Sequence, residues 1–342
     1  MFRRELIECL LKKYKVEILA GDTGRVDDLR DIGCKVSTIP FDRRGLNPVN
    51  EIILLKDFLK KTRELHPTLV ITYTIKPNIY GGTIASLLKV PYAANITGLG
   101  TGFQSDGIKK ILIYMYRKAL RNANVIFCEN ESIKDEFVKD KIADCNKICV
   151  LHGAGVNLER FYYQEYPKDT NVFNFLFVGR VMREKGINEV IESIERLNKE
   201  GKQCILTILG SLEEDYSEIV KNNKHIRFEG WQSDIRPFIA ETHCFVLPSY
   251  HEGMANTNLE CAASGRPVIT TNIPGCREAV INEVSGLLCK PKDVDSLYDA
   301  MKTIMQMSNE QRKNMGLAGR KHVESVFDKT KVVETTINQL HI

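Results

Sequence analysis

The run PSYHEGMANTNLECAASGRPVITTNIPGCREAV, residues 248–280, decides how this chain is interpreted. Pro248 closes an apolar run typical of a buried strand, and a glycine follows an acid at Glu252 and Gly253. The pattern then predicts a helix that begins around Asn256 and carries Glu260. Free backbone N–H groups at a helix start attract a diphosphate, and glycine lets the backbone approach it closely. The run therefore predicts a strand, an anion-binding loop and a helix.

The same alternation of β-rich runs and helical patterns extends over the whole chain. Residues 50–65, for example, have apolar side chains at helical spacing. Alternation of this kind favours parallel sheets covered by helices, here two doubly wound α/β domains in succession. The expected strands are 15–21, 35–41, 68–74, 91–97 and 124–130 in the first domain, and 173–180, 204–210, 226–230, 244–249, 267–271 and 286–290 in the second.

Length and polarity give the domain boundaries. A chain of 342 residues is too long for one typical core and suits two domains. The polar run NLERFYYQEYPKDTN lacks regular apolar spacing and marks the boundary. We expect domains at 1–165 and 166–326. The closing segment, 327–342, is expected to be a helix that crosses back to the first domain.

Bulk composition excludes some classes of protein and leaves one question open. No segment approaches the roughly 18 to 20 uninterrupted apolar residues that span a bilayer. The ten cysteines are scattered without a CxxC pair, which is typical of reduced, buried thiols. Residues 1–150 carry 25 Lys and Arg against 18 Asp and Glu, a charge of +7, and residues 151–342 carry 23 against 26, a charge of −3. The basic half could face an anionic partner or could simply aid solubility.

Several motifs, in order along the chain, carry a resemblance to a known family. Residues 249–269 follow the pattern S-Y-x-E-G-x-x-N-x-x-L-E-x-x-A-x-G-x-P-V-I. The other motifs are TYTIKPNIYG (72–81), NITGLGTGF (95–103), GAGVNLERF (153–161), VGRVMREKGI (178–187), FEGWQSD (228–234) and PGCRE (274–278). Together they resemble glycosyltransferase family 4 over nearly the whole chain. The resemblance implies the GT-B fold, two Rossmann-like domains with a cleft between them, and sugar transfer with retention of configuration.

The resemblance also implies roles for particular residues. Arg180 and Lys185 would neutralise the diphosphate of a nucleotide sugar in place of a metal ion, and Glu252 would bind sugar hydroxyls near the reacting centre. Glu260 would bind the ribose hydroxyls. The implied catalytic residues are Arg180, Lys185 and Glu252. The implied nucleotide-sugar contacts are Gly179, Trp231, Gln232, Gly253, Met254, Ala255, Asn256, Leu259 and Glu260.

The first domain is expected to bind the acceptor, because polar residues follow two of its strands. Lys76 suits a phosphate on a lipid-linked acceptor. The candidates are Tyr73, Lys76, Asn78, Asn95, Thr97 and Gly98. Each could equally be a turn or cap residue. No histidine lies between His66 and His152, where many relatives place one, so catalysis would depend on the cations and on the acceptor's own hydroxyl.

Residues 107–122 form a basic amphipathic pattern, with Ile108, Ile111, Leu112, Met115 and Ala119 on one side and Lys110, Arg117, Lys118 and Arg121 on the other. Such a helix can lie on anionic lipid or can be an ordinary outer helix. The expected partners are a nucleotide sugar, a polyprenyl-diphosphate-linked or saccharide acceptor and an anionic membrane surface, with no nucleic acid and no cofactor. The expected location is the cytoplasm, peripheral on the inner face of the plasma membrane.

Relatives open with a strand and a glycine loop, whereas this chain begins within the pattern of the first helix, FRRELIECLLKKY. The first strand of the first domain is therefore expected to be missing, with low stability or activity as the result.

The function expected is transfer of a hexosyl or N-acetylhexosaminyl group from a UDP-sugar in surface polysaccharide assembly. Two alternatives remain: a nucleotide-sugar epimerase or hydrolase, and a non-catalytic sugar-nucleotide-binding subunit. Asp293 and Asp295 resemble a metal-binding DxD motif, but their place before a helix favours helix-start acids. Gly98, Gly100 and Gly102 suggest a dinucleotide fingerprint, but the third glycine is misplaced.

Overall fold

The chain divides into two compact units. The computed structural model describes residues 3–21, 26–39, 47–104, 106–168 and 170–341. Unit 1 comprises Met1–Ala154 with Val332–Ile342, and unit 2 comprises Gly155–Lys331. The division lies after Ala154, earlier than the boundary at 165 drawn from polarity. The intervening segment packs on unit 2, where the Arg266 guanidinium donates to the Gln164 carbonyl at 3.0 Å.

Unit 2 contains a six-stranded parallel sheet in the order β12-β11-β10-β7-β8-β9. Its strands are β7 (Phe173–Val178), β8 (Cys204–Leu209), β9 (Ile226–Gly230), β10 (Cys244–Leu247), β11 (Val268–Thr271) and β12 (Gly286–Cys289). All six were expected, within a few residues at their ends. The chain builds β8 and β9 on one side of β7 and then returns to build β10, β11 and β12 on the other. This is the doubly wound order, and it reverses between β7 and β10.

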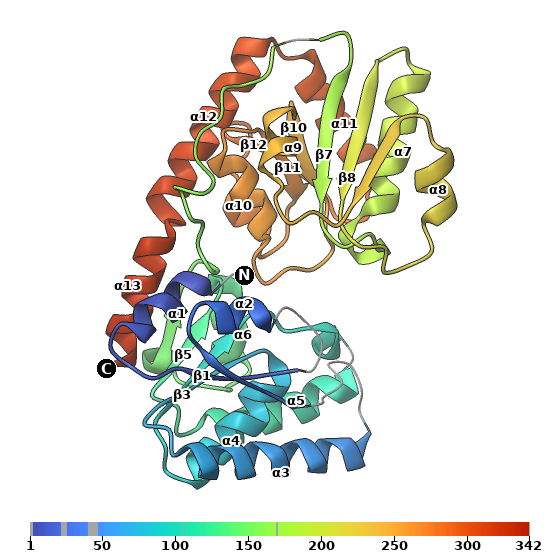
Figure 1. Ribbon diagram of the computed structural model, residues 1–342. Helices are drawn as coiled ribbons and strands as arrows, with labels where there is room; N and C mark the ends of the chain where they lie inside the picture. The colour runs from blue at the N-terminus through green and yellow to red at the C-terminus, as the bar shows by residue number, and fades with distance from the viewer. Residues whose placement is uncertain (1–2, 22–25, 40–46, 105, 169, 342) are drawn as a thin grey trace. The chain divides into compact units, whose positions relative to one another are not determined.

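Helices cover both faces of this sheet. Contacts join α7 to α11 and α10 to α12, and Figure 1 shows these pairs on opposite faces. The helices are α7 (Ile187–Lys199), α8 (Ser217–Asn222), α9 (Arg236–Ala240), α10 (Asn256–Ala263), α11 (Val294–Gln306) and α12 (Asn309–Val326). The buried stripe of α7 was expected from its spacing and is confirmed as core: Ile187, Val190, Ile191, Ile194 and Leu197. Each such side chain contributes about 1.5–3 kcal/mol when fully buried.

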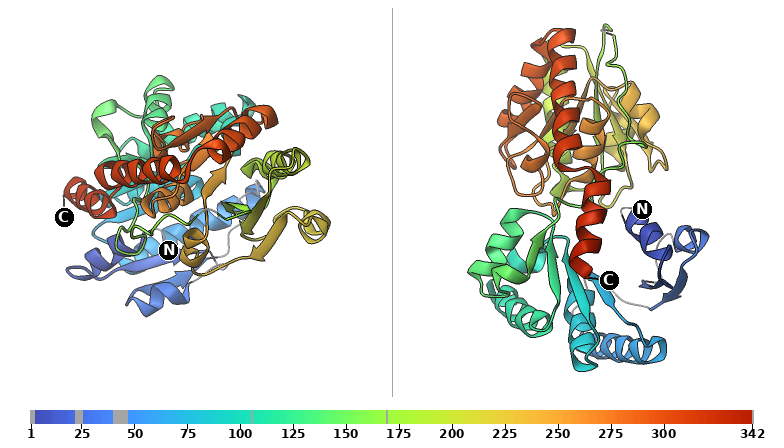
Figure 2. Two further views of the ribbon diagram at one scale, coloured as in Figure 1. Left: turned by 90° about the horizontal axis from the view of Figure 1, so that it is seen from above. Right: turned by 90° about the vertical axis from the view of Figure 1, so that its left-hand side faces the viewer.

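Unit 1 contains two parallel sheets. Strands β1 (Glu17–Ala20) and β2 (Lys35–Thr38) pair with each other, and β3 to β6 form a sheet in the order β3-β4-β5-β6. The latter strands are β3 (Val70–Tyr73), β4 (Tyr92–Ile96), β5 (Val125–Cys128) and β6 (Ile148–Val150). The right-hand view of Figure 2 shows the two sheets separately. Residues 40 and 41 of the expected strand 35–41 lie outside the described residues, and β6 was not expected.

The order of strands in unit 1 has a simple relation to that in unit 2. Among the described residues, β1 pairs with β2 alone and β3 with β4 alone. One strand between β1 and β3 would give unit 1 the doubly wound order of unit 2. The two sheets of unit 1 therefore share the strand order of unit 2 on each side of the point where that order reverses.

Two helices of unit 1 begin at a capping asparagine. The Asn47 side chain accepts a hydrogen bond from the Val49 N–H at the start of α3, and Asn130 caps α6 in the same way. The helices are α1 (Arg4–Leu11), α2 (Asp27–Asp31), α3 (Pro48–Leu65), α4 (Gly82–Leu87), α5 (Asp106–Leu120), α6 (Glu131–Lys139) and α13 (Lys329–Leu340). The last of these begins in unit 2 and joins unit 1 from Val332.

Only part of the apolar side expected for α5 is buried, since Leu112, Met115 and Ala119 belong to or pack against the core. Ile108 and Ile111, which were assigned to the apolar side, are 38% and 61% exposed, whereas Tyr116 is 1% exposed. The reason is geometric: the core contacts come from Leu112, Tyr116 and Ala119, and a side chain one position before Leu112 points about 100° away from them. The helix therefore exposes apolar side chains.

Three other observations concern elements singled out in the sequence. The ten cysteines, all within the described residues, are free thiols. Asp293 caps α11, where its Oδ1 accepts from the Ser296 N–H at 2.9 Å, and this confirms it as a helix-start acid. Asp295 pairs with Arg196 on α7.

None of the helices built from described residues is long and apolar enough to cross a membrane.

Candidate functional site

The residues implied for nucleotide-sugar binding gather where the strand order of unit 2 reverses. In an open parallel sheet the loops that leave two neighbouring strands in opposite directions form a ligand crevice at the strands' carboxyl ends. Here these strands are β7 and β10. Gly179 and Arg180 follow β7, and the run 248–255 follows β10. The topology alone therefore makes this edge the expected place for a ligand.

The loop after β7 brings Lys185 toward β10. A short 3-10 turn, Arg183–Lys185, ends at Gly186, whose φ of 73° favours glycine. A Cβ on Gly186 would lie 2.2 Å from the Pro248 carbonyl oxygen, so the two loops meet at backbone contact distance. The Tyr250 N–H also donates to the Glu184 carbonyl at 2.9 Å. These contacts fix the position of Lys185 relative to the loop after β10.

Lys185 and Glu252 form an ion pair. The Lys185 ammonium donates to Glu252 Oε1, and the Ser249 hydroxyl donates to the same oxygen at 2.8 Å. Both paired side chains are largely buried, with 16% and 14% exposed. The sequence implied a role for each residue separately, and the structure brings them together.

Arg180 differs from Lys185 in being free. It is exposed, and its side chain takes part in none of the hydrogen bonds or ion pairs formed by the described residues. It is therefore an uncommitted cation at the end of β7, close in sequence to the lysine that is already paired. An anion at this edge could bind Arg180 without breaking an existing contact.

A third loop, which contains Gly275, contacts the run that follows β10. The Ala255 N–H donates to the Gly275 carbonyl at 2.7 Å. A Cβ on Gly275 would lie 2.5 Å from the Glu252 carbonyl oxygen. Met254 and Ala255 are buried, 5% and 3% exposed, so little of either residue is open to a ligand.

The first turn of α10 carries an unsatisfied hydrogen-bond acceptor. Asn256 begins the helix, and its side-chain Oδ1 is buried without a hydrogen-bond partner among the described residues. An orphaned polar atom of this kind in a native structure needs an explanation, and a bound ligand is one. Leu259, by contrast, is completely buried in the core, so its side chain is not available to a ligand.

Glu260 is a partly buried carboxyl group on α10 with two cations nearby. Burial raises the pKa of Glu260 from 4.5 to about 7, and the nearby cations Lys329 and Arg160 act in the opposite direction. Between these two pH values the folded protein keeps a proton that the unfolded chain has released. The contribution of Glu260 to stability therefore falls as pH rises from 4.5 to 7.

This pKa gives a prediction for ligand binding. If the carboxylate accepts hydrogen bonds from ribose hydroxyls, binding requires Glu260 to be ionised, and the affinity for a nucleoside diphosphate should fall about tenfold from pH 8 to pH 6. Titration calorimetry at several pH values measures it. In Glu260→Gln the affinity should be lower and the slope shallower, since only the nucleotide's own phosphates then titrate. Equal slopes in the two proteins would rule Glu260 out.

Trp231 and Gln232 follow β9, on the same carboxyl edge of the sheet. Trp231 is 59% exposed, which is unusual for so large an apolar side chain. Gln232 is held by its Nε2, which donates to the Glu229 carbonyl at 2.7 Å. The Gly210 N–H donates to the Gly230 carbonyl at 2.8 Å and ties this loop to the end of β8. An exposed indole on a fixed loop suits stacking on a flat base.

Two of the acceptor candidates in unit 1 have structural roles. Asn78 is completely buried; its Oδ1 accepts from the Thr72 hydroxyl at 2.7 Å and its Nδ2 donates to the Asn95 carbonyl at 2.8 Å. Asn95 is 1% exposed, and its Nδ2 approaches the Thr72 carbonyl at 3.4 Å. Both side chains join the ends of β3 and β4 and are closed to a large acceptor.

The remaining candidates lie at the carboxyl edge of the β3–β6 sheet. Lys76 donates to Glu51 Oε1 at 2.5 Å, and the Tyr80 hydroxyl donates to Oε2 of the same carboxylate at 2.6 Å. Burial, and then the hydrogen bond to Glu51, raise the pKa of Tyr80. Lys76 is therefore already paired with an acid. No sequence motif pointed to Glu51, because α3 reaches this edge only through the tertiary fold.

The last three acceptor candidates are Tyr73, Thr97 and Gly98. Tyr73 closes β3, its ring lies under the Arg3 guanidinium at 5.3 Å, and burial raises the pKa of its hydroxyl. Thr97 and Gly98 follow β4 and are partly exposed, with Gly98 at a φ of 139°. These three can contact a ligand at the edge of unit 1.

Comparison with known proteins gives the family. The sequence model for group 1 glycosyl transferases matches residues 159–322, and that for glycosyl transferase 4-like domains matches residues 1–130. The chain is 30% identical to the capsular polysaccharide biosynthesis glycosyltransferase CapM of Staphylococcus aureus, over 80% of this chain and 77% of CapM. The chain belongs to the group 1 glycosyltransferases.

Two further comparisons extend the result. This glycosyltransferase is 28% identical to the N,N'-diacetylbacillosaminyl-diphospho-undecaprenol alpha-1,3-N-acetylgalactosaminyltransferase of Campylobacter jejuni, over 89% of this chain and 86% of the relative. Its fold matches that of HepE from Anabaena, solved with UDP and glucose, with a TM-score of 0.81 and 15% identity, over 99% of this chain and 95% of HepE. The glycosyltransferase thus has the GT-B fold of two Rossmann-like domains that the sequence predicted.

Proposed function

We propose that this glycosyltransferase transfers a sugar from a UDP-sugar, with retention of anomeric configuration and without a metal ion, to a lipid-linked or saccharide acceptor in surface polysaccharide assembly. The observation that carries the proposal is the position of Arg180, Lys185 and Glu252 on the two loops that flank the strand reversal of unit 2. Two cations and a carboxylate at this edge match a diphosphate joined to a sugar.

The ion pair suggests how the nucleotide sugar would engage these residues. A diphosphate oxygen competes with Glu252 for the Lys185 ammonium. Once the lysine turns to the phosphate, the Glu252 carboxylate keeps the hydrogen bond from Ser249 and can accept hydrogen bonds from the sugar. Arg180 and Lys185 then stabilise the negative charge that develops on the leaving diphosphate, which is the task a divalent cation performs in other transferases.

The remaining contacts follow from the positions described above. Glu260 would accept from the ribose hydroxyls, Trp231 and Gln232 would cover the base, and the backbone of Gly253 to Asn256 would line the phosphates. Uracil is proposed because HepE, which shares this fold, was solved with UDP. Retention is supported by the Campylobacter relative, whose name describes an α-1,3 linkage, since an α linkage made from an α-linked nucleotide sugar keeps the configuration.

The acceptor is proposed from the relatives and from unit 1. The Campylobacter relative is named for a diphospho-undecaprenol substrate, and CapM for capsular polysaccharide. In unit 1, Lys76, Thr97 and Gly98 lie at the edge where such a substrate would bind. Lys76 could bind an acceptor phosphate only by exchanging its present partner Glu51, much as Lys185 would exchange Glu252.

We propose that the enzyme acts at an anionic membrane surface. Helix α5 exposes Ile111 and Tyr114, 61% and 57%, beside the exposed cations Lys110 and Lys118. Exposed apolar side chains flanked by lysine are what a helix lying in a membrane interface requires. A lipid-linked acceptor is found at such a surface.

Thermal unfolding with nucleotides tests the proposed substrate. UDP at 100 times its Kd should stabilise the protein by about 2.7 kcal/mol, and GDP and ADP at the same concentration should do so much less. Lys185→Ala and Glu260→Ala should abolish the shift with UDP. Turnover of UDP-sugars should also require an undecaprenyl-diphosphate saccharide. Release of UDP without an acceptor, at the rate seen with it, would indicate hydrolysis instead of transfer.

A further inference from the structure

Glu189 and Tyr250 form a buried hydrogen bond beside the residues of unit 2 proposed to bind the nucleotide sugar. The Tyr250 hydroxyl donates to Glu189 Oε1 at 2.5 Å. Glu189 lies in the first turn of α7, and Tyr250 lies in the loop after β10. The two residues are only 8% and 9% exposed. The family resemblance implied no role for either of them.

The position of Glu189 at the start of a helix does not explain its burial. An acid in the first turn stabilises the helix dipole even when it faces solvent, as the exposed Glu310 can do in α12. Glu189 is buried instead, and its Oε2 has no hydrogen-bond partner among the described residues. A buried carboxylate with one unpaired oxygen is less favourable than an apolar side chain of similar size. Stability alone therefore does not account for the pair.

The hydrogen bond is maintained at neutral pH because Tyr250 keeps its proton. Burial, and then the hydrogen bond to Glu189, raise the pKa of Tyr250 to about 12. The ring of Tyr250 has a separate contact, since Lys292 Nζ lies 5.1 Å from the ring centroid. Removal of the hydroxyl alone therefore leaves the contact of the ring with Lys292 in place.

The hydrogen bond joins the two segments that carry Lys185 and Glu252. Lys185 ends the turn that leads into α7, and Glu252 lies in the same loop as Tyr250. The Tyr250 N–H also donates to the Glu184 carbonyl of that turn at 2.9 Å. Tyr250 thus links the turn to the loop in addition to the ion pair between Lys185 and Glu252.

The two links respond differently to a nucleotide sugar. The ion pair is broken when the Lys185 ammonium turns to the diphosphate, as proposed above. The hydrogen bond from Tyr250 to Glu189 does not involve the lysine and therefore remains. Ser249, next to Tyr250, still donates to the Glu252 carboxylate. The position of the tyrosine is in this way passed on to the carboxylate.

We propose that Glu189 and Tyr250 are positioning residues, whose hydrogen bond keeps the Glu252 carboxylate beside the sugar after Lys185 has turned to the diphosphate. The inference rests on the nucleotide-sugar binding proposed above and deepens it. Both residues act through the loop that carries Glu252. Their effect belongs to the enzyme with its sugar bound, so it should appear in kcat and not in the binding of a nucleotide that lacks the sugar.

Tyr250→Phe tests the inference because it removes the hydroxyl and keeps the ring. Its kcat for transfer from a UDP-sugar should fall about tenfold, since a small displacement of a group at the reacting centre has a large effect on the rate. Its Kd for UDP, measured by titration calorimetry, should stay within about twofold of the wild-type value. The same titration counts the UDP-binding sites, so kcat is expressed per site and unfolded protein does not contribute.

Tyr216→Phe is the matched control. Tyr216 is 7% exposed, and its hydroxyl donates to Asn188 Oδ1 at 2.8 Å. It therefore links a buried tyrosine to the same turn of α7, but from the segment between β8 and α8. Loss of this hydroxyl should change Tm about as much as loss of the Tyr250 hydroxyl. The kcat per site should equal that of the wild type.

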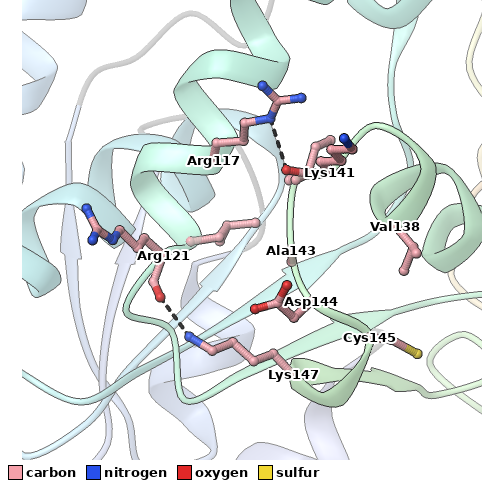
Figure 3. A pocket seen from close by; sticks show the side chains of 10 residues that line it. Arg117, Arg121, Val138, Lys141, Ala143, Asp144, Cys145 and Lys147 are labelled. Atoms are coloured by element: carbon pink, nitrogen blue, oxygen red, sulfur yellow. Dashed lines mark hydrogen bonds between the residues drawn. The ribbon is translucent and has the colours of Figure 1, made fainter.

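A second control removes a hydrogen bond from unit 1. Lys147 Nζ donates to the Arg121 carbonyl at 2.7 Å, on the wall of a cavity of about 440 Å³ at the end of α5 (Figure 3). This bond caps the carboxyl end of α5. Lys147→Met should leave kcat per site unchanged, whatever its effect on Tm.

Two variants at Glu189 separate position from stability. Glu189→Leu with Tyr250→Phe replaces both partners of the hydrogen bond by apolar side chains, which should return Tm toward the wild-type value. The kcat should stay low, because an apolar contact does not fix the direction of the loop as a hydrogen bond does. Glu189→Gln keeps an acceptor for the Tyr250 hydroxyl and should retain most of the wild-type rate.

Two outcomes would overturn this inference alone. Equal kcat per site in Tyr250→Phe and Tyr216→Phe would mean that the Tyr250 hydroxyl does not position Glu252. Recovery of kcat together with Tm in the double variant would leave the pair only a structural role. A wild-type protein that binds UDP but transfers no sugar to an undecaprenyl-diphosphate saccharide would instead overturn the proposed function, and this inference with it.

Discussion

Loss of the Lys185 ammonium should lower kcat/KM for the UDP-sugar by about 10²–10³-fold, the effect typical of removing one preorganised group that stabilises transition-state charge. Lys185→Met is the change of choice because it keeps the apolar stem. The loss should appear mainly in kcat, since the charge on the leaving diphosphate develops as the bond breaks. Initial rates of UDP release with an acceptor present measure it.

Arg180→Ala separates catalysis from folding in the same experiment. Arg180 is exposed and its side chain forms no hydrogen bond or ion pair in the described part of the chain, so its loss should leave Tm unchanged while the rate falls by a similar factor. Lys199→Ala removes an exposed cation at the far end of α7 and should leave the rate unchanged. Wild-type rates in both Lys185→Met and Arg180→Ala would refute the roles assigned to these cations.

Gly186→Ala should destabilise unit 2 by about 3 kcal/mol. A Cβ at this position adds the strain of a left-handed backbone and meets the Pro248 carbonyl oxygen at 2.2 Å. Because the obstacle is backbone, either the turn that carries Lys185 or the end of β10 must move. Urea unfolding should show the loss of stability, and activity should fall with it.

Gly201→Ala is the matched control for this substitution. Gly201 also has a positive φ, 80°, but a Cβ there has nothing within 4 Å. It should cost only the conformational strain, about 1–2 kcal/mol. Equal costs for the two substitutions would mean that contact with Pro248 does not constrain the loop.

Much of unit 2 could be predicted from the sequence because its strands are covered on both faces. Strands such as β7 and β10 are almost entirely buried, so they appear in the sequence as continuous apolar runs bounded by glycine or proline. Strand β6 has only three residues, all partly buried, and is too short to give such a run. The apolar side of α5 was predicted only in part, because Ile108 and Ile111 are also apolar but are exposed, whereas Leu112, Met115 and Ala119 pack on the core.

The sequence likewise predicted some features of the candidate site and not others. The motif around Glu252 and Glu260 placed Glu252 in the correct loop and Glu260 in the correct helix. This was possible because the succession of strand, loop and helix depends on the local sequence. Burial of side chains was not predictable in the same way. Both faces of β4 are buried, so no alternation indicated that Asn95 is enclosed. The pairing of Lys185 with Glu252 joins residues 67 positions apart and depends on the strand order.

The helix α13 has a consequence for how this protein is synthesised. Val332 and Leu340 belong to a core cluster with Ala93, Val125 and Phe127 of unit 1. Unit 1 is thus built from both ends of the chain, whereas unit 2 is one uninterrupted segment. A ribosome delivers the whole of unit 2 between the two segments that build this core. The core of unit 1 can therefore be completed only after unit 2 has been translated.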